Sequence, residues 1–273
     1  MAEQIWNDFA RLNAGERFRR QSAEMGTDVT RAIVAAAHIA PGMRVLDVAC
    51  GAGEPAISLA ELLRDTGEVT GVDMAAGPLE VARQRAEQRG LTNLHFQQAD
   101  VHALGFRGES FDRVTSRLGV MFFGNPVQAL GELRRVLRPG GRVALLVWGG
   151  LDQPYFHMTI GTILRLHPEF EIPPTARQML QYGEAGRLTS HLTEAGFRDV
   201  HEQLHHICWD WHGTPEELWD YFRSITMPFR PLIEKVADNA EVNEAVLASM
   251  REHYDGEYVR IQAQMVIATA ERS

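Results

Sequence analysis

Apolar residues follow two alternating patterns between about residue 41 and residue 149 of this chain. Short apolar runs are typical of strands, and stretches in which apolar residues return every third or fourth position are typical of helices. We expect strands over residues 44–49, 68–74, 94–100, 111–117 and 142–148. We expect helices over residues 54–65, 77–89 and 126–138. This alternation predicts parallel strands joined by crossover helices, hence a Rossmann-like, doubly wound, mostly parallel α/β sheet.

The regions before residue 41 and after residue 149 do not continue this alternation of strands and helices. Residues 6–39 carry apolar positions at helical spacing, and Pro41-Gly42 ends the pattern. Beyond residue 149, prolines and glycines interrupt short helical stretches; a helix is expected over 184–195, strands over 198–211 and 258–270, and helices between those strands. We therefore predict an N-terminal helical cap (1–40), a core (41–149), a lid insertion (150–182), and a final unit (183–273). The final unit ends the sheet and carries a helical insertion at about 212–256, which completes a substrate pocket.

Composition limits the possible partners. The 27 Lys and Arg residues against 36 Asp and Glu residues give a formal charge of −9. Nucleic-acid binding relies mainly on Lys and Arg neutralising phosphates, so we expect a small-molecule substrate and no nucleic-acid partner. Two cysteines cannot build a disulfide framework, and no apolar run is long enough to span a bilayer. With no signal-peptide pattern at the N-terminus, we expect a cytoplasmic protein.

A glycine-rich turn follows the first expected strand. Gly51, Gly53 and Ala56 fit the G-x-G-x-x-G/A spacing of nucleotide-binding turns, in which glycine lets the backbone approach a ligand. Asp73 follows about 20 residues later at the end of the second strand, where a carboxylate can accept hydrogen bonds from a ribose diol. Strand, turn, helix and spaced acid together predict a site for an adenosine-containing cofactor.

The charges expected near this turn help to distinguish two adenosine-containing cofactors, NAD and S-adenosylmethionine. Four carboxylates are expected around one crevice, those of Asp47, Glu54, Asp73 and Asp100. They would repel the pyrophosphate of NAD, whereas the sulfonium and amino groups of S-adenosylmethionine would be stabilised there. The pattern favours S-adenosylmethionine, with S-adenosylhomocysteine as the product form.

These stretches resemble the class I S-adenosylmethionine-dependent methyltransferases. The segments that carry the resemblance are 45–53, 69–74, 98–101 and 137–143. Residues 116–123 are similar to a bacterial small-molecule branch related to quinone-ring and natural-product methyltransferases. The Asn/Asp-Pro-Pro-Tyr/Phe tetrapeptide of DNA-base methyltransferases is absent after strand four, where Ser116-Arg117-Leu118-Gly119 stands. The resemblance therefore argues against a nucleobase substrate.

The resemblance also implies roles for individual residues. Asp47, Ala49, Gly51 and Gly53 would hold the methionine part of the cofactor. Asp73 would bind the ribose hydroxyls, and Met74 would lie against the adenine face. Asp100 and Val101 would meet the adenine edge, and Ser116 and Arg117 would face the methionine end and the incoming substrate.

The residues just past the fifth strand and on the later elements supply the candidates for catalysis and substrate binding. Tyr155 and His157, just past the fifth strand, are candidates for a general base or for wall residues of the pocket. Met121, Trp148, Tyr155 and His212 are candidate pocket residues, although Met121 and Trp148 could equally fill the core. His201, His205, His206 and His212 gather around one expected strand, and His206, Asp210 and His212 would share a face. This grouping suggests a metal site, but strand surfaces also collect histidines without function, and we expect no metal.

We therefore expect methyl transfer from S-adenosylmethionine to a small, partly apolar molecule by in-line displacement at the sulfonium methyl. Oxygen, nitrogen, carbon and sulfur acceptors remain open, as does the oligomeric state. The alternatives are an NAD(P)-dependent oxidoreductase on the same type of sheet, and a non-catalytic binder that keeps the cofactor as structure.

Overall fold

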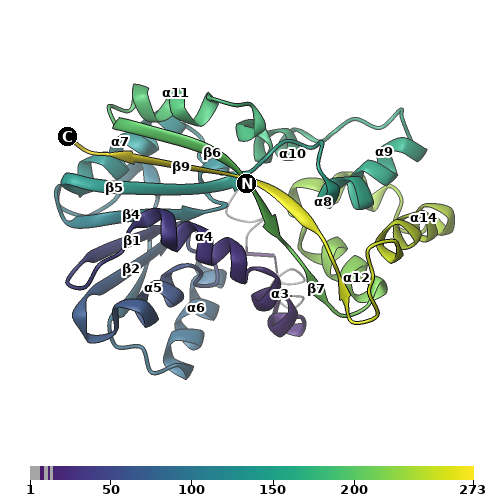
Figure 1. Cartoon of the computed structure of the whole chain (residues 1–273), viewed down its shortest axis with the longest axis horizontal. Coiled ribbons are helices and arrows are strands. Elements are labelled where there is room, and N and C mark those ends of the chain that lie inside the picture. Colours follow the sequence, from purple (N-terminus) through teal and green to yellow (C-terminus); the bar gives the residue numbers. More distant parts are fainter. Residues whose placement is uncertain (1–6, 9–11, 13–14) are drawn as a thin grey trace.

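The described chain is built around one central sheet (Figure 1). The computed structural model describes residues 7, 8, 12 and 15–273, and among them seven strands pair in the order β3-β2-β1-β4-β5-β9-β6. The strands are β1 (Arg44–Val48), β2 (Glu68–Asp73), β3 (Leu94–Gln98), β4 (Phe111–Arg117), β5 (Leu137–Trp148), β6 (Arg198–Cys208) and β9 (Gln262–Glu271). Strands β1 to β5 are parallel, and β9 pairs antiparallel with both β5 and β6. The predicted fold class is confirmed.

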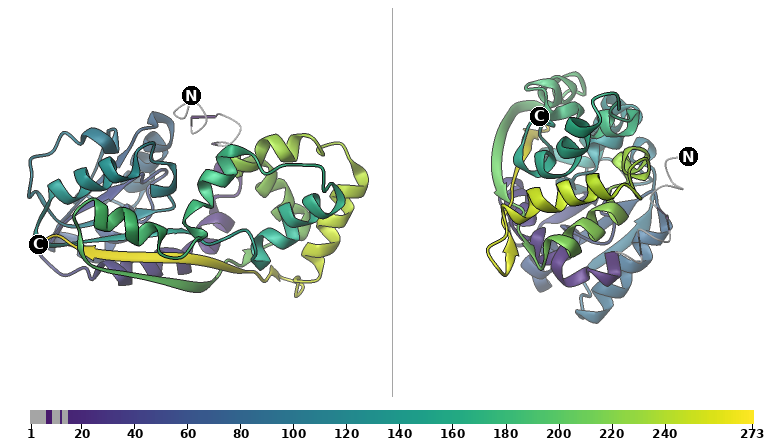
Figure 2. Two further views of the ribbon diagram at one scale, coloured as in Figure 1. Left: turned by 90° about the horizontal axis from the view of Figure 1, so that it is seen from above. Right: turned by 90° about the vertical axis from the view of Figure 1, so that its right-hand side faces the viewer.

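Helices cover both faces of this sheet (Figure 2). They are α4 (Thr27–Ala37), α5 (Ala56–Leu63), α6 (Ala76–Gln88), α7 (Pro126–Val136) and α11 (Arg187–Glu194). Helix α4 packs on one face of β4, β5 and β9, while α7 and α11 pack against each other on the opposite face. Between the faces, every side chain from Val143 to Trp148 on β5 is buried, as expected for a strand covered on both sides.

Short helical turns connect several of these elements. They are η1 (Arg64–Thr66), η2 (Val101–Ala103), η3 (Val120–Phe122) and η5 (Gln181–Gly183). At the start of α7, the Asn125 side chain accepts a hydrogen bond from the Gln128 amide, and Pro126 occupies the first helical position, where a missing N–H costs nothing. The connection after β4 is thereby fixed next to the ends of the strands.

A second group of helices lies beyond the carboxyl ends of β1 to β5; we call it the cover. It contains α3 (Arg19–Met25), α8 (Pro154–Phe156), η4 (His157–Gly161), α9 (Thr162–Leu166), α10 (Pro174–Met179), α12 (Pro215–Ile225), η6 (Met227–Phe229), α13 (Arg230–Glu234), α14 (Ala240–Arg251) and the hairpin of β7 (Trp211–His212) and β8 (Tyr258–Val259). Figure 2 shows the cover standing beside the sheet as a separate ring of helices. The long strands β6 and β9 lead into and out of it.

The N-terminal helix differs from the sequence prediction. Within the described residues it breaks at Gly26 into α3 and α4, and only α3 belongs to the cover, where it packs on β7. Helix α4 instead packs on one face of the sheet. The part of the predicted cap at residues 1–6, 9–11, 13 and 14 lies outside the described residues.

Two predicted strands have different bounds in the structure. Strand β6 ends at Cys208. The Trp209 amide still donates to the Ile261 carbonyl (2.9 Å), but the Asp210 carboxylate replaces the backbone acceptor of the Ile261 amide (2.9 Å) and also accepts from the Arg260 guanidinium (2.9 Å). The chain then continues as the separate β7–β8 hairpin. At the other end, β5 begins at Leu137, five residues before the predicted start at residue 142.

Candidate functional site

The turn after β1 has backbone conformations that require small residues. Gly51 and Gly53 have φ values of +52° and +110°, and Ala49 has +54°. A Cβ at Gly53 would lie 2.6 Å from Cδ1 of Ile57, whereas a Cβ at Gly51 would meet no atom within 4 Å. The φ of Gly53 and its close packing on α5 therefore favour glycine there, whereas the Cα of Gly51 faces open space.

Asp73 ties this turn to the second strand. One carboxylate oxygen accepts a hydrogen bond from the Gly51 amide (2.9 Å), and the other accepts one from the Ala75 amide (2.9 Å). Asp73 and Met74 line a cavity, and Met74 remains 42% exposed at the cavity wall. A large apolar side chain left open in this way offers a flat ligand an apolar surface.

The end of β3 contributes a further acidic side chain. Asp100 accepts hydrogen bonds from the backbone amide (2.9 Å) and the ring Nδ1 (2.7 Å) of His102, and these bonds hold its pKa below the ordinary value. Asp100, Val101 and His102 all line the same cavity as the glycine turn. The ends of β1, β2 and β3 thus form one polar wall, which we call the glycine-turn half of the cavity.

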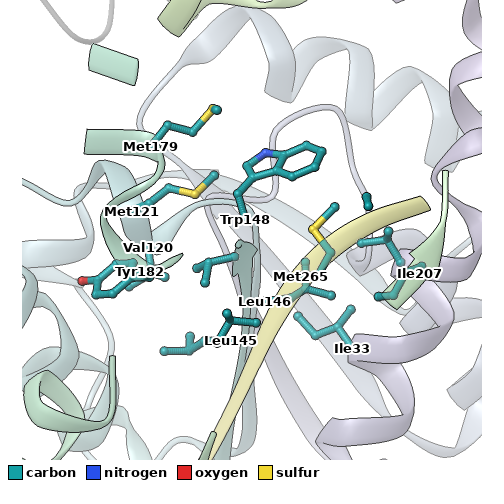
Figure 3. Close-up of a cluster of buried hydrophobic side chains, with 14 of the residues drawn as sticks. Ile33, Val120, Met121, Leu145, Leu146, Trp148, Met179, Tyr182, Ile207 and Met265 are labelled. Carbon is teal, nitrogen blue, oxygen red and sulfur yellow. The ribbon is translucent and has the colours of Figure 1, made fainter. Parts of the chain in front are cut away.

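The cavity continues from this wall to the cover, with a total volume of about 1680 Å³. This exceeds the ~300–1,000 Å³ of typical single-ligand pockets and leaves room for two molecules. Its far end, which we call the aromatic half, is lined by Met121, Phe122, Phe123, Trp148, Tyr155, Phe156, Met179, Trp209 and Tyr221. Figure 3 shows Trp148 at the end of β5 with Met121 and Met179 beside it. The Trp148 ring stacks on Tyr155 with centroids 4.8 Å apart and meets Trp209 at 5.4 Å.

Comparison with known proteins identifies the family. A family model described as a methyltransferase domain matches residues 39–148. The chain is 32% identical over 180 residues to the demethylmenaquinone methyltransferase of Lactiplantibacillus plantarum, covering 61% of this chain and 75% of the relative. It is 35% identical over 153 residues to the aklanonic acid methyltransferase of a Streptomyces species, covering 56% and 66%. The chain belongs to the class I S-adenosylmethionine-dependent methyltransferases.

The fold agrees with that assignment. A solved S-adenosylmethionine-dependent methyltransferase from Aquifex aeolicus superposes with a TM-score of 0.54 at 18% identity, covering 70% of this chain and 92% of that one. The cofactor of this methyltransferase is accordingly S-adenosylmethionine, and the nicotinamide alternative finds no support.

The residues present fit that cofactor. The space beside the Gly51 Cα is open, the Asp73 carboxylate retains lone pairs beyond its two backbone bonds, and the Met74 side chain is exposed beside it. A ribose diol, an adenine face and an amino-acid group can each find a partner along this wall. The glycine-turn half suits the adenosyl end, and the space toward the cover suits the acceptor.

Three of the expected cofactor residues do not line the cavity of the methyltransferase. Asp47 is fully buried beneath the turn, where it accepts hydrogen bonds from the Thr115 hydroxyl (2.7 Å) and the Ala56 amide (3.2 Å). Burial raises its pKa to about 7, against the opposing effect of those bonds and of the Arg117 charge. Ser116 is also fully buried, and Gly53 packs on α5. These three residues support the conformation of the turn but do not form part of the cavity wall.

The charge argument made from sequence was incomplete. Among the described residues that line the cavity, four acids face seven arginines: Glu16, Glu54, Asp73 and Asp100 against Arg17, Arg19, Arg20, Arg31, Arg85, Arg89 and Arg117. The crevice is therefore not uniformly acidic, although the chain as a whole carries −9. Six of these arginines lie between residues 17 and 31 or on and just after α6, where sequence reasoning did not place site residues, whereas Arg117 at the end of β4 was expected at the site.

The two candidate bases have different environments. Tyr155 lies in the aromatic half, and burial raises its pKa well above the ordinary value for a phenol. At neutral pH it is a neutral hydrogen-bonding group rather than a base. His157 is not among the lining residues; its ring is 59% exposed and lies 2.8 Å from the Asp152 carboxylate.

The remaining candidate histidines do not come together in one cluster. His212, expected in the pocket, instead stacks on Tyr258 and lies 3.2 Å from the Glu24 carboxylate. The break in β6 separates His206 from His212, and Asp210 is held by Arg260. Within the described part of the chain, no group of three or more His, Cys, Asp or Glu side chains is placed to hold a metal ion.

Sequence reasoning missed three residues that line the cavity. Thr30 on α4 contacts Arg117, and the Trp209 indole and Thr226 hydroxyl are nine-tenths buried without a hydrogen-bond partner among the described residues. No local sequence motif marks these positions. Each residue lines the cavity only because the cover or α4 packs against the rest of the fold.

Proposed function

We propose that this methyltransferase acts on a small, flat, apolar molecule bound in the aromatic half of the cavity. The observation that carries the proposal is the continuity of one cavity from the glycine turn to the Trp148, Tyr155 and Trp209 rings. Aromatic walls bind flat rings by stacking and exclude water from the reacting groups. Two relatives are named for small organic acceptors, demethylmenaquinone and aklanonic acid.

We also propose which residues bind the cofactor. Asp73 takes the ribose hydroxyls, Met74 lies against the adenine, and Asp100 with Val101 meets the adenine edge. The peptides of Ala49 and Gly51 face the amino-acid part. Asp47 and Gly53 act indirectly, by holding the turn in the conformation that exposes those peptides.

The protein's part in the reaction follows from these positions. When bound, S-adenosylmethionine supplies a methyl group activated by its positive sulfur. The chain aligns the acceptor and keeps water out, and such alignment contributes much of the rate in reactions whose electrophile is already activated. Tyr155, neutral at working pH, donates or accepts a hydrogen bond and does not remove a proton.

Two further properties belong to this proposal. We propose a small-molecule rather than a nucleic-acid substrate, in line with the net charge of −9. We also propose a cytoplasmic location, because both cysteines are free thiols, as is usual in a reducing compartment. No helix of the described residues has the length and apolar character needed to cross a bilayer.

A methyl-transfer assay tests the proposed function. Protein, S-adenosylmethionine with a labelled methyl group, and a panel of hydroxylated ring compounds and aliphatic amines are incubated, and labelled products are identified by mass spectrometry. We expect label only in ring compounds, and loss of transfer in Trp148→Leu. Trp219→Leu is the matched control, because it removes a buried indole that does not line the cavity. Transfer to aliphatic amines alone, or equal loss in both variants, would overturn the proposal.

A further inference from the structure

Arg117 is the charged side chain that the proposed function leaves unexplained. It stands at the end of β4, is half-buried, and lines the cavity. No carboxylate of the described residues lies within 4.0 Å of its guanidinium, whereas Arg17, Arg31, Arg85 and Arg89 on the same cavity each have one. A desolvated arginine without an ion-pair partner is unusual, because the cost of desolvating its charge is not offset.

The guanidinium is nevertheless held firmly in place. Its Nη1 donates a hydrogen bond to the Thr30 hydroxyl (2.7 Å) and approaches the Gly26 carbonyl (3.5 Å), and the Thr30 hydroxyl itself donates to that carbonyl (3.0 Å). A Cβ at Gly26 would lie 3.2 Å from Nη1, so the glycine at the break between α3 and α4 leaves room for the group. Helix α4 therefore orients Arg117 without neutralising it.

This arrangement leaves one edge of the guanidinium available. A guanidinium has five N–H donors, and the hydrogen bonds from Arg117 to the described residues use only Nη1. The Nε and Nη2 donors lie side by side and match the two oxygens of a carboxylate or similar anion. Glu54 and Asp47 are close enough to favour the charged form, but Glu54 is already hydrogen-bonded to Ser58 and Asp47 to Thr115 and Ala56.

The aromatic half adds further donors near the cover. The indole N–H of Trp209 and the hydroxyl of Thr226 are buried without a partner among the described residues, and both residues line the cavity. An indole N–H can only donate. The four described acids of the cavity lie on residue 16, the glycine turn and the ends of β2 and β3, so none lies in the aromatic half. The chemistry there suits oxygen groups that accept hydrogen bonds, not a protonated amine.

We propose that Arg117 binds an anionic oxygen of the methyl acceptor, so that the acceptor is an aromatic acid whose carboxylate or phenolate pairs with the guanidinium. This inference rests on the proposed function and adds the charge of the substrate to it. The cofactor's own carboxylate is a second source of the same chemistry, and the experiment is built to separate the two.

The acceptor is tested with a matched pair of ligands, 2-naphthoate and 2-naphthamide, titrated calorimetrically into protein saturated with S-adenosylhomocysteine. We expect naphthoate to bind at least tenfold more tightly than naphthamide, and this preference to fall to about one in Arg117→Met. Arg20→Met is the control, because Arg20 is an exposed arginine of the same cavity. Equal binding of the two ligands to the wild-type protein overturns the inference but leaves the proposed function standing. Failure of both ligands to bind, with S-adenosylhomocysteine still bound, overturns both.

The cofactor is tested with S-adenosylhomocysteine and 5′-methylthioadenosine, which lacks the amino-acid end. If Arg117→Met weakens binding of the first at least tenfold, leaves the second unchanged and does not alter the naphthoate preference, Arg117 serves the cofactor and the inference is wrong. Thr30→Val offers a variant that leaves Arg117 in place and removes only its hydroxyl partner. We expect it to reduce the naphthoate preference severalfold, and an undiminished preference would contradict the orienting role of α4.

Discussion

The buried carboxyl group of Asp47 makes the stability of this methyltransferase depend on pH in a direction that can be stated in advance. In the unfolded chain an aspartate releases its proton near 3.8, whereas in the folded protein burial raises the pKa of Asp47 to about 7. Between these values the folded state binds a proton that the unfolded state does not, so stability falls as pH rises. The Asp47→Asn variant removes the titration but keeps the shape of the side chain. Its amide can accept from the Ala56 N–H and donate to the Thr115 hydroxyl.

The magnitude follows from the two pKa values. Integrating proton release between pH 5 and pH 7 gives a loss of about 2 kcal/mol in the free energy of unfolding of the wild-type protein relative to the variant. Urea unfolding at pH 5, 6 and 7 measures it for both proteins. The wild type should be closest to the variant at pH 5 and weakest relative to it at pH 7. Asp65→Asn, at an exposed position after α5, controls for the general effect of removing a carboxylate.

One result would refute this reasoning. If the difference between wild type and Asp47→Asn stays constant from pH 5 to pH 7, Asp47 has the same protonation in the folded and unfolded states. Burial beneath the glycine turn would then not determine its charge, because the Arg117 guanidinium and the two hydrogen bonds would fully offset it. If these favourable interactions dominated, the folded pKa of Asp47 would lie below 3.8, and the wild type would lose stability relative to the variant only as pH falls from about 5 toward 3.

Three further predictions concern the site. Asp73→Asn, with one acceptor oxygen for two backbone amides, should weaken S-adenosylhomocysteine binding by roughly 1–3 kcal/mol in calorimetry, and unchanged affinity would count against the ribose assignment. Gly53→Ala should lower the free energy of unfolding by roughly 2–3 kcal/mol, because a φ of +110° is strained for alanine and the new Cβ would crowd Ile57 and Ala82. Gly51→Ala should cost about 1 kcal/mol of stability but strongly weaken cofactor binding, and equal stability losses in urea unfolding would contradict this contrast. Tyr155→Phe should leave the shape of the pH profile of kcat/KM between pH 6 and 9 unchanged, since a phenol with a raised pKa does not titrate there; loss of a basic limb would contradict this.

The cofactor half of the site could be predicted from sequence because its signals are local. The turn at Gly51 and Gly53 is specified by residues next to each other in the chain, and Asp73 follows at the distance set by one helix and one strand. Parallel strands bring their ends to one edge, so the acids at those ends gather without further information. The orientation of Asp47 was not predictable in this way, since a strand buried on both faces does not indicate which side of the sheet a residue faces.

The acceptor half could not be predicted because its contacts are distant in sequence. Thr30 and Arg117 are 87 positions apart, and their hydrogen bond depends on how α4 packs on the sheet. The placing of His212 was wrong for a similar reason: the break after Cys208 directs the following residues into a separate hairpin against α3. Periodicity indicates that a helix has an apolar face but not which distant surface that face will contact.

The order of strands in the sheet has a consequence for how the chain folds as it is synthesised. Strand β9 is the last strand of the described chain to be made, yet it occupies the place between β5 and β6. Until residues 262–271 have left the ribosome, the apolar edge of β5 is unpaired and β6 has no neighbour in the sheet. An exposed apolar strand edge invites pairing with other chains. The nascent protein therefore passes through a stage in which the cover has been synthesised but the sheet is open, and chaperones that shield strand edges should act at that stage.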